Sequence, residues 1–142
     1  MSLKAINAYK KGNLKQEIAA ADPHKLTLML MQGAIDRIAF AKGLIERKDF
    51  SAKSEYISRA HAIIMHLRDT LDVEVGGETA QNMFALYEYM LEQLQEGHLR
   101  NDINYLNEVI SLLTPIRDAW VQIPETAKQE AYELQRQKRQ AV

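Results

Sequence analysis

Apolar side chains recur three and four residues apart in four separate segments of this 142-residue chain. The spacing matches the turn of an α-helix, so each segment can form a helix with an apolar stripe along one side. The second segment shows the pattern most clearly, with a stripe made of Ile57, Ala60, Ile64, Leu67 and Leu71. Because such stripes must be buried against one another, the sequence predicts an all-α fold, an antiparallel four-helix bundle with short turns.

Cap and turn residues set the expected helix boundaries. Asp22-Pro23 combines an acidic N-cap with the residue best suited to the first helical position. Gly76-Gly77 marks the turn before the third helix, because each glycine costs a helix interior about 1 kcal/mol relative to alanine. Gly97 is expected to end that helix. The expected helices cover about residues 22–48, 49–71, 78–96 and 101–123.

The apolar pattern also divides the chain into three parts. Residues 1–21 contain few apolar side chains among several lysines, which predicts a mobile N-terminal arm. Residues 22–123 form the bundle. Residues 124–142 are polar and predict a short or frayed C-terminal helix. Within the fourth helix, Pro115 should produce a kink, since it removes a backbone hydrogen bond and presses on the carbonyl of Ser111.

Composition argues against several classes of function. The chain has 18 Lys and Arg against 19 Asp and Glu, a formal net charge of −1, which provides no strong positive field for nucleic acid. It has no cysteine, so a thiol nucleophile or a cysteine-ligated metal is excluded. Neither a signal peptide nor a membrane-spanning run is apparent, so we expect a cytoplasmic protein that is not inserted in a membrane.

The histidines do not form the site expected of a metal-binding bundle. A di-iron site requires Glu three residues before a ligating His. The residues three before the four histidines are Ala21, Ser58, Ile63 and Gln95. No glycine-rich phosphate loop is present either. We therefore expect no enzyme activity, metal or cofactor.

The first helix carries more apolar surface than a bundle interior requires. One stripe consists of Leu26, Met29, Leu30, Gly33 and Phe40. A second, on the opposite side, consists of Leu28, Met31, Ile35, Ile38 and Ala39. Such a helix is either packed on every side within the fold or uses its second stripe to bind a partner.

Candidate binding residues also occur outside the first helix. Ala62 and Met65 lie opposite the stripe of the second helix, and Tyr89 projects away from the stripe of the third. Ile6 and Tyr9 stand one helical turn apart in the arm. A flexible methionine beside small residues is typical of a surface that receives a foreign helix, although ordinary solvent-facing residues explain the same pattern.

One block of the sequence resembles a known family. The run from Leu71 to Met90 reads Leu-Asp-x-Glu-x-Gly-Gly-Glu-x-Ala-x-Asn-x-x-x-Leu-Tyr-x-Tyr-Met, which is similar to the signature of the flagellin export chaperone family, FliS. The resemblance covers about residues 3–123. Further matches are Ala8-Tyr9, Pro23-x-x-Leu26-x-x-Met29-Leu30, Leu99-Arg100-Asn101-Asp102 and Ala119-Trp120. The chain departs from the pattern at Asp22, where Ser is usual, at Met31, where an aromatic residue is common, and at Pro115.

The resemblance implies a helical bundle that binds the disordered C-terminal segment of newly made flagellin. Such a chaperone prevents premature polymerisation and delivers its client to the flagellar type III export gate. It also implies that the arm covers the binding surface when the client is absent, with Ile6 and Tyr9 as its anchors. We expect a monomer with at most weak self-association.

The hypothesis for the client path uses the outer faces of the first three helices. Its residues are Leu28, Met31, Ile35, Ala62, Met65 and Tyr89. The alternative is a helical regulatory or assembly protein that homo-oligomerises through its extra apolar stripes.

Overall fold

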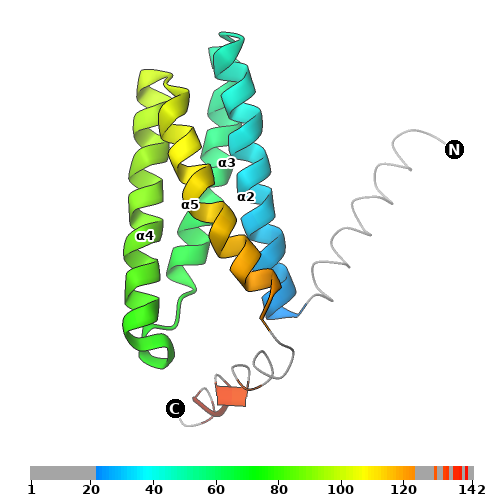
Figure 1. Ribbon diagram of the computed structural model, residues 1–142, viewed down its shortest axis with the longest axis vertical. Coiled ribbons are helices and arrows are strands. Elements are labelled where there is room, and N and C mark those ends of the chain that lie inside the picture. The colour runs from blue at the N-terminus through cyan, green and yellow to red at the C-terminus, as the bar shows by residue number, and fades with distance from the viewer. Residues whose placement is uncertain (1–21, 124–129, 131–132, 135, 139, 141–142) are drawn as a thin grey trace, which may run out of the picture.

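The computed structural model describes residues 22–123 and, nearer the C-terminus, residues 130, 133–134, 136–138 and 140. The predicted arm, with Ile6 and Tyr9, lies outside the described residues, as does most of the predicted tail. The bundle consists of α2 (Pro23–Glu46), α3 (Phe50–Asp69), α4 (Val73–Arg100) and α5 (Ile103–Val121), which alternate in direction (Figure 1). The all-α antiparallel four-helix bundle is confirmed.

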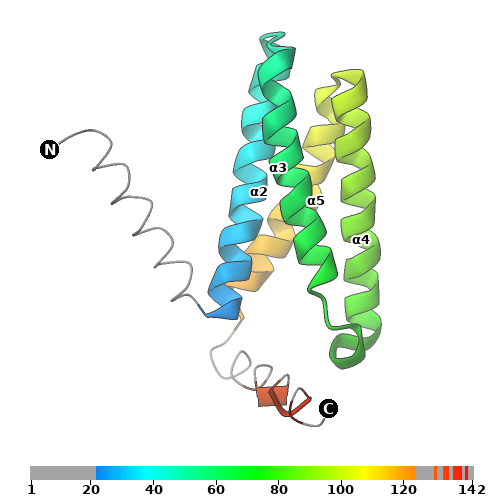
Figure 2. The same cartoon turned by 180° about the vertical axis from the view of Figure 1, so that it is seen from behind.

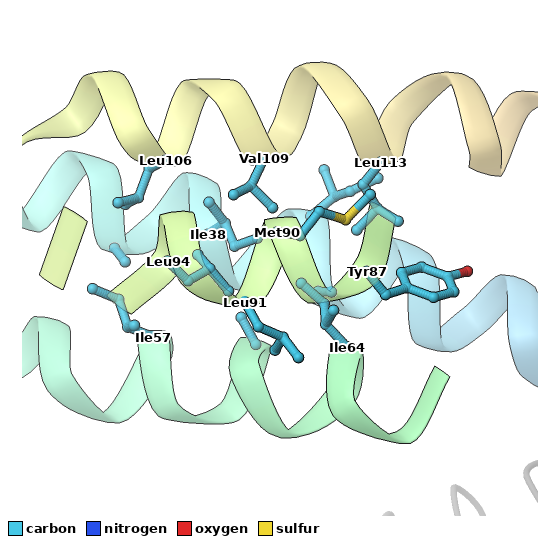
Figure 3. Packing of buried hydrophobic residues seen from close by; sticks show 14 of the residues in the cluster. Ile38, Ile57, Ile64, Tyr87, Met90, Leu91, Leu94, Leu106, Val109 and Leu113 are labelled. Atoms are coloured by element: carbon cyan, nitrogen blue, oxygen red, sulfur yellow. The ribbon is translucent and has the colours of Figure 1, made fainter. Parts of the chain in front are cut away.

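The four helices form a closed ring around one core. Helix α2 packs against α3 and α5, and α4 packs against the same two helices from the opposite corner (Figure 2). Each helix contributes fully buried side chains to the centre (Figure 3), among them Ile38, Ile64, Met90, Leu94, Leu106, Val109 and Leu113. Burying each of these side chains contributes about 1.5–3 kcal/mol before the entropic cost of ordering it.

An aspartate occupies the N-cap of each helix, and for α2 this is the predicted Asp22. The Asp22 carboxylate accepts a hydrogen bond from the Lys25 amide at 2.7 Å, and Asp102 accepts one from Asn104 at 2.9 Å. Asp49 occupies the N-cap of α3, but its side chain forms no capping bond. The position of this helix therefore depends on its buried stripe rather than on its cap.

The third predicted helix differs from the structure at both ends. Helix α4 begins at Val73, and the left-handed backbone of Gly77 (φ 56°, ψ −134°) separates its first turn from the remainder. The expectation that Gly97 ends this helix is wrong, because α4 continues to Arg100 and the left-handed Asn101 (φ 50°) caps it. Gly97 is buried, and a Cβ there would lie 2.5 Å from Leu106 Cδ1 of α5. This glycine serves close helix packing, not termination.

Helix α5 continues through Pro115 to Val121. The lost backbone bond therefore does not interrupt the helix, and the kink expected at Pro115 stays a prediction.

The first and last helices of the bundle are joined by a reciprocal contact. His24 Nε2 donates to the Trp120 carbonyl at 2.7 Å, and Trp120 Nε1 donates to the His24 carbonyl at 3.0 Å. Their rings stack with centroids 5.1 Å apart. The contact closes the ring of helices at the end where residues 22 and 123 leave the bundle (Figure 1).

Candidate partner-binding surface

The second apolar stripe of α2 faces the core. Met31 is 1% exposed and Ile35 is 8% exposed, and both belong to the central cluster. The expectation that these two side chains lie on the outer face is therefore wrong. The helix uses this stripe to pack against its neighbours, which leaves the opposite stripe nearer the surface.

Leu28 and Tyr89 lie beside α5, on opposite sides of it. Leu28 is half-buried and stands one turn before Gln32, whose side-chain oxygen accepts a hydrogen bond from Arg117 of α5 at 2.7 Å. The exposed Tyr89 donates from its hydroxyl to Glu108 of α5 at 3.4 Å. Partial burial, together with the charge of Glu108, raises the pKa of Tyr89.

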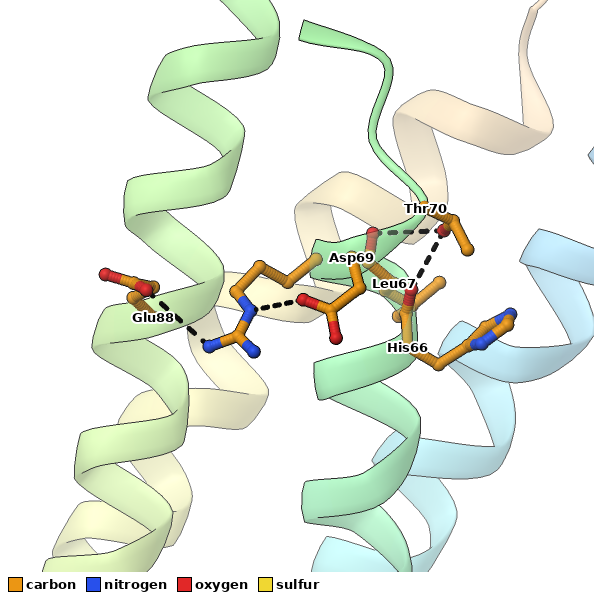
Figure 4. Close-up of polar contacts among 6 residues, drawn as sticks. His66, Leu67, Asp69, Thr70 and Glu88 are labelled. Carbon is orange, nitrogen blue, oxygen red and sulfur yellow. Dashed lines mark hydrogen bonds and ion pairs between the residues drawn. The ribbon is translucent and has the colours of Figure 1, made fainter.

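Ala62 and Met65 share the outer side of α3. Both are exposed, Met65 to 38%. One turn further, Arg68 reaches α4, with Nη1 3.5 Å from Glu88 Oε1 and its guanidinium 5.6 Å from the Phe84 ring centroid. In Figure 4, a dashed line to Glu88 marks this ion pair between the two helices. Met65 therefore lies on the flank of α3 that adjoins α4.

The imidazole of His61 lies on the same flank, one turn before Met65. Partial burial and the charge of Arg68 lower its pKa, so the ring is neutral at pH 7. The flank thus combines a methionine, an alanine and an uncharged imidazole.

These positions do not all lie on the outer faces of the first three helices, where the client path was predicted. Two of the six bundle residues belong to the core, two lie on α3, and two lie beside α5. Whether any of them contacts a partner stays a prediction.

A further apolar surface lies between α2 and α3, outside the residues predicted to bind the client. Phe40 is 49% exposed and its ring lies 4.4 Å from that of Tyr56, centroid to centroid. A Cβ added to Gly33 would lie 3.8 Å from Ile63 Cδ1. We call Met29, Gly33, Phe40, Tyr56 and Ile63 the α2–α3 seam; all are at least partly accessible.

The signal for this seam was present in the sequence. Met29, Gly33 and Phe40 are spaced four and seven residues apart, so they share one side of a helix. Periodicity groups residues by side, but it does not say which of two apolar sides faces inward.

The surfaces described above present mainly apolar side chains. Among the described residues, no group of three or more His, Asp and Glu side chains could hold a metal ion. In that same part of the chain, no helix combines the length with the apolar character that crossing a membrane requires.

Comparison with known proteins identifies relatives over most of the chain. A model of the family described as "Flagellar protein FliS" matches residues 5–127, which include all four helices. Flagellar secretion chaperone FliSB of Pseudomonas aeruginosa is 40% identical over 119 residues, 84% of this chain and 94% of that protein. Flagellar secretion chaperone FliS of Vibrio cholerae is 38% identical over 120 residues, which are 84% of this chain and 88% of that protein. Flagellar secretion chaperone FliS of Salmonella typhimurium is 40% identical over 128 residues, which are 89% of this chain and 95% of that protein.

Proposed function

The chain belongs to the FliS family of flagellar secretion chaperones, and from this premise we propose that its client is the disordered C-terminal segment of flagellin. In the cytoplasm, binding would prevent the client from polymerising prematurely and would deliver it to a component of the flagellar export gate. The proposal assigns a binding role and no catalytic step.

The observation that carries the proposal is the apolar surface left after the core is complete. Phe40, Tyr56 and Met65 remain accessible although every helix of the bundle already packs against two others. Proteins in solution seldom expose a large apolar patch without a binding role. A segment that is disordered alone can wrap such surfaces and fold on them, at an ordering cost that keeps release possible.

We place the main contacts on the two flanks of α3. The α2–α3 seam lies on one flank, and Met65, with Ala62 beside it, lies towards the other. An extended client can cross α3 and contact both. Leu28 and Tyr89 provide secondary contacts beside α5, whereas Met31 and Ile35 support the surface from within.

We also propose that the N-terminal arm competes with the client. Its anchors, Ile6 and Tyr9, would occupy the client's surface in the free protein and leave when flagellin binds. In this role the arm is an internal competitor that keeps the exposed side chains from self-association.

Charged substitutions test this surface. Phe40→Glu and Met65→Glu should each weaken binding of the cognate flagellin C-terminal segment, by about 30-fold if the position is a hot spot worth about 2 kcal/mol. Calorimetric titration measures the affinity, and circular dichroism verifies that the bundle is intact.

Leu99→Glu is the matched control, because Leu99 is 71% exposed near the end of α4. It introduces the same charge at a position outside the proposed contacts and should leave affinity unchanged. Wild-type affinity in both surface variants would place the client elsewhere on the protein.

The exposed side chains also suit the alternative, a regulatory or assembly protein that homo-oligomerises. Sedimentation separates the two functions. A monomer whose mass is independent of concentration and that binds one client segment is incompatible with the oligomer.

A further inference from the structure

A lysine from the C-terminal region contacts the turn between α3 and α4. Lys138 Nζ lies 2.9 Å from Asp72 Oδ1 and 2.6 Å from Glu74 Oε2. The chain separation between Lys138 and Asp72 is 66 residues, so the contact joins distant parts of the molecule. A single ammonium bridges both carboxylates.

Asp72 and Glu74 lie where the chain enters α4. We call residues 72–77 the α4 elbow. Asp72 is the N-cap of α4 and also accepts the Val75 amide at 3.1 Å. At the other end of the elbow, Gly77 adopts a left-handed φ of 56°. The elbow therefore joins a capped helical turn to the main part of α4, and Lys138 contacts its capped end.

The contact shifts the pKa values of Asp72 and Lys138 in opposite directions. Hydrogen bonding from Lys138 is the main cause that lowers the pKa of Asp72. Hydrogen bonding to Glu74 and Asp72 raises the pKa of Lys138. These shifts favour the ionised forms of Asp72 and Lys138 near neutral pH.

A neighbouring cation makes a different contact from that of Lys138. Arg136, two residues earlier, pairs with Glu133 within the same segment. Its charge is therefore satisfied locally, whereas that of Lys138 is directed at the bundle.

We propose that Lys138 is an electrostatic latch, which closes on the α4 elbow through its contacts with Asp72 and Glu74. Exposed ion pairs contribute little individually and are screened by salt, so docked and undocked forms exchange and ionic strength sets their ratio. In the docked form, Asp72 and Glu74 are occupied and cannot receive a cation from another molecule. The proposal does not depend on what the protein binds.

Distance measurement between two spin labels tests the latch. The chain has no cysteine, so Gln81→Cys in α4 and Gln140→Cys, both at exposed positions, allow specific labelling of the full-length protein. At low salt we expect a short-distance population that decreases as salt is added. Lys138→Gln should reduce the docked-to-undocked ratio about three- to tenfold, as expected for losing two exposed ion pairs.

The control is Arg136→Gln, which removes the same charge two residues away. It should leave the short-distance population in place, and Glu74→Gln should reduce it by less than Lys138→Gln does, because Asp72 remains. The latch is refuted if the distances in Lys138→Gln match those of the parent, or if Arg136→Gln opens the segment to the same extent. Asp72 is left unchanged because it also caps α4.

Discussion

Lys53 is a buried charge that stabilises the end of a different helix. It lies in α3 and is 4% exposed, and its Nζ donates to the His98 carbonyl at 2.5 Å and to the Asn101 side chain. A cation is favoured at the C-terminal end of a helix, where unpaired carbonyls are concentrated. Lys53 thus holds the left-handed Asn101 that turns the chain from α4 into α5. Burial lowers the pKa of Lys53.

Removing this amine should destabilise the bundle. Lys53→Met keeps the aliphatic stem but leaves the carbonyl of His98 and the side-chain oxygen of Asn101 without their donor, at a cost of about 1–3 kcal/mol in the free energy of unfolding. Urea denaturation measures the effect. Lys25→Met, at an exposed position of α2, is the control and should stay within about 0.5 kcal/mol of the parent. Equal free energies of unfolding for the two variants would show that the Lys53 amine does not stabilise the bundle.

His98 makes stability depend on pH. Its Nδ1 is buried without a hydrogen-bond partner among the described residues. Burial, and then the charge of Lys53, lower its pKa below the ordinary value. The unfolded state therefore binds the proton more readily, so stability is complete above about pH 6.5 and decreases as the pH falls below it.

We expect the free energy of unfolding to fall between pH 7.5 and about pH 5, and to fall less in His98→Gln. Urea denaturation across this pH range measures both slopes. Identical slopes would show that His98 does not carry the effect. His61, whose pKa is also lowered, should account for part of the slope that remains.

At the scale of the helices, Gly97 sets how closely α4 and α5 approach. A Cβ there would meet Leu106 Cδ1 at 2.5 Å and Tyr105 Cβ at 2.9 Å. The buried stripe of each helix determines which of its sides faces the core. Gly97 determines how far apart α4 and α5 lie.

Gly97→Ala should therefore destabilise the protein by about 1–3 kcal/mol, the usual cost of overpacking a core. Thermal or chemical unfolding measures the difference. Gly43→Ala is the matched control in α2, since a Cβ there would meet only the flexible end of the Arg47 side chain, at 3.3 Å. It should be neutral, or stabilising by up to about 1 kcal/mol because alanine favours helix. The account fails if Gly97→Ala is as stable as the control.

The elements show what the sequence could predict. Stripes such as that of Ile57, Ala60 and Ile64 located all four helices, and the Asp22 cap located the start of α2, because capping and periodicity are local properties. The end of α4 was missed because the role of Gly97 depends on α5. The orientation of α2 was missed because both of its sides are apolar, so only packing against its neighbours decides that Met31 is buried and Phe40 exposed.

At the scale of the whole molecule, several features meet at one end of the bundle. The start of α2, the end of α5 and the turn between α3 and α4 all lie there (Figure 1). The contact between His24 and Trp120 holds the first two of these together. The N-terminal arm and the C-terminal region thus join the bundle close to each other.

The proposed role of the arm predicts a change in the free protein. Deleting residues 1–18 should increase the fluorescence of a dye that binds apolar surface and should promote aggregation, because the α2–α3 seam loses its cover. The proposed anchors supply the control, since Ile6→Ser together with Tyr9→Ser should act in the same direction in a chain of full length. A deletion variant that stays monodisperse and binds no more dye than the parent would count against an internal competitor.

The central claim is that this bundle binds the C-terminal segment of flagellin on accessible apolar side chains. Titration of the full-length protein with the isolated segment, followed by calorimetry and by sedimentation, tests it most directly. We predict saturable binding of one segment to one monomer, with a gain in helical circular dichroism as the client folds on the bundle. Absence of binding, or a protein that self-associates and takes up no segment, would contradict the account.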